Sequence, residues 1–131
     1  MNPEEMKART RCFALRIIRL AESLPDTSTA KVIRHQMIRC GSSVGANYRA
    51  ACRARSKPDF VSKMGIVEEE ADETIYWMEL LIDAGIVKQS RMAELLDEAD
   101  QILSIVISSI KTAKGIGANP QSAISDQKSY A

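Results

Sequence analysis

Apolar residues recur every three or four positions through most of this chain of 131 residues. That spacing places them on one face of an α-helix, and it extends over four segments. The segments are about residues 4–23, 28–55, 58–84 and 88–114. Pro25, the run "SKPD" and Gly85 separate them, and prolines and glycines commonly end helices. Because the connections are short, we predict an all-α protein, an up-down-up-down antiparallel four-helix bundle.

Each segment has its own apolar stripe, and together the four stripes are the expected core. They consist of Met6, Phe13, Ile17, Leu20 and Leu24; of Ile33, Met37, Cys40, Val44, Tyr48 and Ala51; of Phe60, Met64, Val67, Ala71, Ile75 (or Thr74), Met78 and Ile82; and of Met92, Leu95, Ala99, Ile102, Val106, Ile110 and Ala113. Ile18, Ile105 and Ile107 lie outside the stripes. Extra apolar positions indicate a second buried surface, between subunits.

Residues 1–114 are expected to form this one domain, and residues 115–131, which lack periodicity, a flexible C-terminal tail. The three cysteines lie in helical patterns without CxxC spacing, as in a reducing compartment. The N-terminus has no apolar signal segment, and the longest strongly apolar stretch, "ILSIVISSI", has nine residues. We therefore expect a cytoplasmic protein that does not enter a membrane.

Opposite charges are divided between two parts of the chain. Residues 1–57 carry twelve Lys or Arg and four Asp or Glu, a net charge of +8. Residues 58–100 carry three Lys or Arg and twelve Asp or Glu, a net charge of −9, whereas the whole chain has a net charge of +1. Two interpretations stay open. The two parts neutralise each other within the fold, or part of the basic surface is free for an anionic partner.

The stretch "CGSSVGANYRAACRARSKPDF", residues 40–60, places two glycines four positions apart inside a helical pattern. Each glycine costs about 1 kcal/mol relative to alanine in a helix, so Gly41 and Gly45 need a reason. Glycines at this spacing share a face and permit close approach of another backbone, either within the bundle or from a second chain. A fold-back near residue 56 sets the expected neighbours. These are Gly41 and Glu73, Gly45 and Glu69, Met37 and Trp77, and Arg49 and Gly65.

The acidic run "EEEADE", residues 68–73, needs cations nearby, because carboxylates three or four positions apart repel each other on one helix face. Arg39, Arg49 and arginines of the first segment are the available partners. A metal site is the competing interpretation. The single histidine, His35, lacks the Glu-x-x-His spacing of di-metal bundles, so we expect no metal and no cofactor.

Enzymatic patterns are missing as well. No Gly-rich phosphate loop follows a strand pattern. Some helical-bundle ribonucleases have an arginine five to seven positions before a histidine, but here residues 28–30 occupy those positions with Ser, Thr and Ala. We therefore expect no catalytic residues and no small-molecule substrate.

The run from residue 37 to residue 81 resembles the four-helix-bundle proteins encoded within intervening sequences of bacterial 23S ribosomal RNA genes. The motifs "SSVGANYR", "ARSKPDF" and "EADETIYWMELL" carry the resemblance. Ala50 and Pro58 depart from its pattern, where an acidic residue and a non-proline are expected. The chain is also similar to the accessory variability determinant of diversity-generating retroelements, a basic bundle that binds a reverse transcriptase and nucleic acid. Both resemblances imply a homopentamer.

Two functions follow as hypotheses. The first is a non-enzymatic homo-oligomeric adaptor that contacts RNA or a nucleic-acid-processing protein. Its basic surface would comprise Arg9, Arg16, Arg19, Arg49, Arg53, Arg55 and Lys57, of which the last four are the candidate nucleic-acid-binding residues. The second is a protein-binding scaffold whose arginines pair with acidic residues of its own or a neighbouring subunit; an RNA-processing enzyme is a distant third. The candidate residues for helix packing or oligomer contact are Gly41, Gly45, Gly65, Glu70, Glu73 and Trp77.

Overall fold

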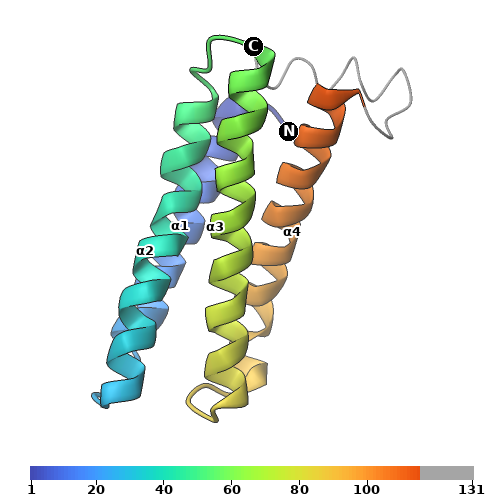
Figure 1. Cartoon of the computed structure of the whole chain (residues 1–131). Coiled ribbons are helices and arrows are strands. Elements are labelled where there is room, and N and C mark those ends of the chain that lie inside the picture. Colours follow the sequence, from blue (N-terminus) through green and yellow to red (C-terminus); the bar gives the residue numbers. More distant parts are fainter. Residues whose placement is uncertain (116–131) are drawn as a thin grey trace.

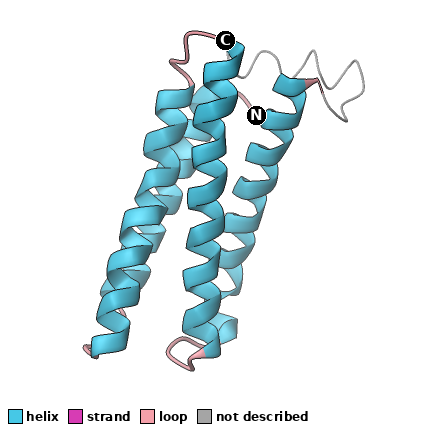
Figure 2. Ribbon diagram, in the orientation of Figure 1, coloured by secondary structure: helices cyan, strands magenta, loops and turns pink. Residues whose placement is uncertain are grey.

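The computed structural model describes residues 1–115 as four long helices with short connections. They are α1 (Pro3–Glu22), α2 (Ser28–Ala51), α3 (Lys57–Asp83) and α4 (Gln89–Lys114). Consecutive helices run in opposite directions, and every described element in Figure 2 is a helix, a loop or a turn. The predicted up-down-up-down bundle is therefore confirmed (Figure 1). Beyond Gly115, the expected flexible tail lies outside the described residues.

Local capping explains where the helices begin and end. The side chains of Thr27 and Ser56 accept hydrogen bonds from the third residue beyond each, which satisfies backbone N–H groups at the starts of α2 and α3. Gly115 adopts a left-handed conformation, with φ of 71°, directly after α4. Glycine adopts this conformation without steric cost, so a residue with a Cβ atom would be strained there.

Helix α2 ends four residues earlier than its periodicity predicted, at Ala51. The backbone N–H groups of Arg53 and Ala54 bond to carbonyl groups three residues back, and the Asp59 carboxylate accepts the N–H of Arg55. These bonds satisfy the backbone N–H groups of a tight turn. The chain must reverse its direction before α3 begins, and this turn uses residues that the periodicity had assigned to the helix. Arg53 therefore lies in the loop after α2 and not in the helix, which the periodicity predicted to extend to residue 55.

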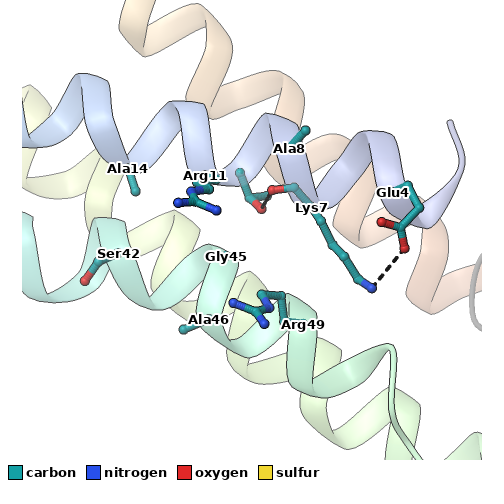
Figure 3. A pocket seen from close by; sticks show the side chains of 10 residues that line it. Glu4, Lys7, Ala8, Arg11, Ala14, Ser42, Gly45, Ala46 and Arg49 are labelled. Carbon is teal, nitrogen blue, oxygen red and sulfur yellow. Dashed lines mark hydrogen bonds and ion pairs between the residues drawn. The ribbon is translucent and has the colours of Figure 1, made fainter.

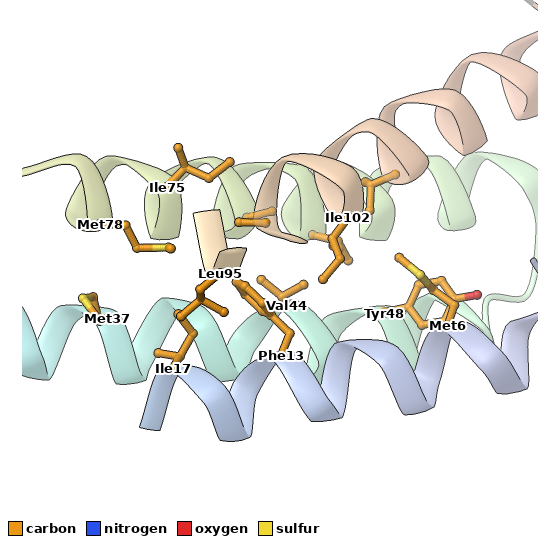
Figure 4. Close-up of a cluster of buried hydrophobic side chains, with 14 of the residues drawn as sticks. Met6, Phe13, Ile17, Met37, Val44, Tyr48, Ile75, Met78, Leu95 and Ile102 are labelled. Carbon is orange, nitrogen blue, oxygen red and sulfur yellow. The ribbon is translucent and has the colours of Figure 1, made fainter. Parts of the chain in front are cut away.

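Apolar side chains from all four helices fill the centre of the bundle (Figure 4). The predicted stripes are buried with two exceptions, since Leu20 and Ile82 are only half-buried. Ala21 and Leu81 take their places in the core. The reason is helical drift: a period of 3.6 makes the next inward position four residues after Ile17, but three after Met78.

Contacts between the helices are uneven around the bundle. Helices α2 and α3 share the most extensive contact, and α1 and α4 the least extensive of the four neighbouring pairs. An ion pair joins α1 to α4, in which Arg9 Nε and Nη2 donate to Glu98 at 2.8 and 2.7 Å. The hydrogen bond from Arg9 holds the pKa of Glu98 below its ordinary value.

Candidate nucleic-acid interface

The two glycines of α2 face α1, not α3. A Cβ atom on Gly41 would lie 2.9 Å from Cγ2 of Ile17, and one on Gly45 would lie 3.0 Å from Oγ1 of Thr10. The expected neighbours Glu73 and Glu69 are therefore wrong. The interpretation as a close helix approach within the bundle holds, but the approach is between α1 and α2.

Gly65 plays no comparable part. A Cβ atom there would meet nothing within 4 Å, so this residue does not mark a close approach within the described chain. Arg49 lies beside α1, where it lines a groove with residues of that helix, and it is not the neighbour we had expected for Gly65. The fold-back rule matches residues of α2 and α3 by their position along the bundle, but it does not show which neighbouring helix a given face of α2 contacts.

An ion-pair network links α2 to α3 and uses part of the acidic run. Arg39 donates to the carboxylates of Glu70 and Glu73, and Trp77 Nε1 donates to Glu73 at 3.1 Å. Of the partners that the sequence predicted for the acidic run, Arg39 pairs with it, whereas Arg49 forms no ion pair with a described residue. Glu70, Glu73 and Trp77 contribute to packing between the helices of one chain, with Trp77 half-buried against the core and edge-to-face with Tyr76.

Three of the four candidate nucleic-acid-binding residues lie close together, with Arg53 and Arg55 in the loop between α2 and α3 and Lys57 at the first position of α3. Arg53, Arg55 and Lys57 are all exposed, and none has a side-chain hydrogen bond or ion pair with another residue of the described chain. Asp59, the nearby acid, pairs instead with Lys63 at 2.7 Å, and that hydrogen bond lowers the pKa of Asp59. The Asp59 carboxylate also interacts electrostatically with Arg55, so the positive charge of residues 53–57 is compensated only in part.

Arg9, Arg16 and Arg19 of α1 do not form one free surface. Arg9 is bound by Glu98 and also donates to Gln101 at 2.8 Å. Arg16 is half-buried, and its charge helps to lower the pKa of Glu98 after the larger effect of Arg9. Arg19 is exposed in the last turn of α1.

A groove between α1 and α2 brings together cations that the sequence did not connect. Its volume is about 660 Å³. Lys7, Arg11 and Arg49 line it, with Glu4 bound to Lys7 at 3.1 Å (Figure 3). Its remaining lining is small: Ala8, Thr10, Ala14, Ser42, Gly45 and Ala46. The spacing of Lys7 and Arg11 by one helical turn was the available signal, but only the fold shows that Arg49 faces the same space.

Within residues 1–115, no group of three or more His, Cys, Asp or Glu side chains is placed to hold a metal ion. None of the four described helices combines the length and the apolar composition that crossing a bilayer requires.

The comparisons with known proteins agree with this architecture. The sequence model of the 23S rRNA-intervening sequence protein family matches residues 5–108. A solved structure from Bacteroides thetaiotaomicron VPI-5482, described as a protein with unknown function from the S23 ribosomal protein family, is 35% identical. The match covers 85% of this chain and 99% of that one, with a TM-score of 0.78. No curated protein matches the chain. The chain belongs to the 23S rRNA-intervening sequence protein family.

Proposed function

We propose that this protein is a non-enzymatic, homo-oligomeric adaptor that contacts RNA through one end of its helical bundle. One observation carries the proposal. Arg53 and Arg55 of the α2–α3 loop and Lys57, the first residue of α3, are exposed within five residues, and the adjacent acid, Asp59, is paired with Lys63. Exposed cations without side-chain partners are the groups that neutralise phosphates and release counterions on binding nucleic acid.

The positive charge extends across that end of the bundle. The α2–α3 loop lies at the same end as the C-terminus of α4 (Figure 1). Lys57 and Lys114 line one shallow pocket there, and Lys111 is a further exposed cation in the last turn of α4. We call Arg53, Arg55, Lys57, Lys111 and Lys114 the basic end. Phosphate contacts from such a surface position a nucleic acid without reading its bases.

Self-association would multiply this surface. Large apolar side chains are exposed on three helices, at Leu15, Val32, Ile66 and Tyr76. The three apolar residues that the sequence predicted for the contact between subunits, Ile18, Ile105 and Ile107, are half-buried within one chain. We propose a homopentamer, which the resemblance to pentameric bundles favours, and in which five weak basic ends act together by multivalency.

A protein-binding scaffold is the second candidate function, and the outer face of α3 favours it. Exposed acids alternate there with exposed apolar groups, as at Glu69, Tyr76 and Glu79. Such a face suits a basic protein partner and repels RNA.

RNA binding at several salt concentrations separates the two functions. We expect Arg53→Ala/Arg55→Ala/Lys57→Ala to weaken binding to all RNA sequences alike. Each lost phosphate contact should reduce the slope of log affinity against log salt by about 0.7–0.9. The matched control is Lys31→Ala/Lys88→Ala/Arg91→Ala, which removes three exposed cations near the opposite end. Equal weakening by both variants, or no RNA binding by the intact protein at low salt, would refute the RNA function.

A further inference from the structure

The groove between α1 and α2 holds two guanidinium groups from different helices. Arg11 comes from α1 and Arg49 from α2, and neither has a hydrogen bond or ion pair with any residue of the part of the chain that the structure describes. Figure 3 shows them on the facing walls of the groove. Lys7 adds a third cation, and Glu4, which pairs with it, is the one acid among the lining residues. The groove therefore has a net positive charge that its own walls do not neutralise.

The other polar groups of the groove do not neutralise this charge. The hydroxyl of Thr10 lies within hydrogen-bond distance of the carbonyls of Met6 and Lys7, and the Ser42 hydroxyl bonds to the Ile38 carbonyl at 2.6 Å. Both hydroxyls are thus occupied within their own helices. The free donors that remain are guanidinium N–H groups, whose planar fork suits the oxygens of a phosphate.

The shape of the groove favours a single strand over a duplex. Ala8, Gly45 and Ala46 place little side chain on its walls, so a narrow ligand can approach both helices closely. A volume of about 660 Å³ lies within the range of sites that hold compact organic ligands, which is the size class of a nucleotide unit. An RNA double helix is wider than one α-helix and cannot enter a groove between two packed helices.

We infer that the α1–α2 groove binds the phosphate backbone of single-stranded RNA, with Arg11 and Arg49 holding one phosphate between the two helices. This rests on the proposed function, in which RNA reaches the basic end. Arg49 lies in the last turn of α2, just before the loop that carries Arg53 and Arg55, so a strand bound at the loop can continue into the groove. The groove would then give the protein a higher affinity for single-stranded RNA than for duplex RNA. The exposed cations near the loop would not by themselves distinguish the two.

The test is fluorescence anisotropy with a short unstructured RNA and an RNA duplex of equal length, for the full chain and its variants. We expect Arg11→Gln/Arg49→Gln to bind the single strand about tenfold more weakly and with a smaller salt slope. Duplex binding should change less than twofold. The control Lys31→Gln/Arg91→Gln removes two exposed cations elsewhere and should leave both affinities unchanged. Thermal melting checks that each variant remains folded.

A second variant tests the groove without removing an arginine. Ala46 is exposed and lines the groove, so Ala46→Glu adds a negative charge there without disturbing the core. It should weaken single-strand binding selectively. Unchanged single-strand binding in both groove variants, or equal losses for strand and duplex, would overturn the inference. A change of oligomeric mass without loss of RNA affinity would also overturn it, because the groove would then hold an acidic segment of a second copy.

The outcomes separate this inference from the function on which it rests. If Arg53→Ala/Arg55→Ala/Lys57→Ala weakens RNA binding and the groove variants do not, only the assignment of the groove fails. If the intact protein binds neither RNA, the proposed function fails.

Discussion

Gly41 lies so close to Ile17 that no side chain fits between them. A Cβ atom at Gly41 would come within 2.9 Å of Cγ2, 3.2 Å of Cγ1 and 3.3 Å of Cβ of Ile17. Ile17 is completely buried and branched at Cβ, so it has little freedom to move aside. The glycine thus sets how closely α1 and α2 approach, and Gly45, one helical turn further along α2, lines the groove between them.

Alanine substitutions at the three helical glycines should therefore differ in sign. Gly41→Ala gains about 1 kcal/mol of helix propensity but suffers overpacking of about 1–3 kcal/mol, so we expect a net loss of stability. Gly45→Ala should lose less, because its nearest contact is 3.0 Å. Gly65→Ala, which meets nothing within 4 Å, is the control and should gain up to about 1 kcal/mol. Urea unfolding measures all three; a stabilised Gly41→Ala variant would disprove the close approach.

The Arg9–Glu98 ion pair should make stability depend on pH in the acid range. Because the pKa of Glu98 is lowered in the fold, its contribution is fully present above the ordinary value of 4.5. It is lost as the pH falls through the lower folded value. We expect Glu98→Gln to cost about 1 kcal/mol at pH 7 and to lose less stability than the parent on acidification.

Thermal melting between pH 3 and pH 7, for Glu98→Gln and for Glu94→Gln, checks this prediction. Glu94 is exposed on the same helix and forms no ion pair with a described residue, so its substitution removes an equal charge without the bond. Parallel curves for the parent and Glu98→Gln would show that the pair contributes nothing.

The three cysteines should react with a thiol reagent in a fixed order. Cys12 is exposed, Cys52 is half-buried and Cys40 is fully buried. Burial also raises the pKa of the Cys40 thiol, which keeps it protonated and unreactive. We expect Cys12 to react first in the native protein and Cys40 only on unfolding. Rates for the parent and for Cys12→Ser, with and without denaturant, measure this; rapid native labelling that survives in Cys12→Ser would contradict it.

Self-association should give a solution mass of five copies at micromolar concentration, measured by light scattering. If the exposed apolar groups of α3 lie in the subunit contact, Ile66→Lys/Tyr76→Lys should lower that mass. It should leave the fold intact, because both side chains are more than 40% exposed. Ser62→Lys, at an exposed position of the same helix, is the control. A monomer mass for the parent across this range would contradict the pentamer.

The sequence alone was sufficient for the helices and most of the core. Periodicity and helix-ending residues act within one or two turns, so the run "SKPD" could be identified as the boundary before α3, and Val44 or Ile102 as core, without knowledge of their partners. Arg39 was also among the cations expected near the acidic run, and it pairs with Glu70 and Glu73.

Only the tertiary structure decided which neighbour each face contacts. Every helix of a four-helix bundle has two neighbours, and periodicity shows which residues share a face but not which neighbour that face meets. Gly41 and Gly45 therefore face α1, which the sequence did not predict. Arg49 lines a groove with Lys7 and Arg11, which lie far from it in the sequence. The position of Arg53 outside α2 also depends on the tertiary structure. The length of a turn is set by how the two long helices that it joins pack beside each other.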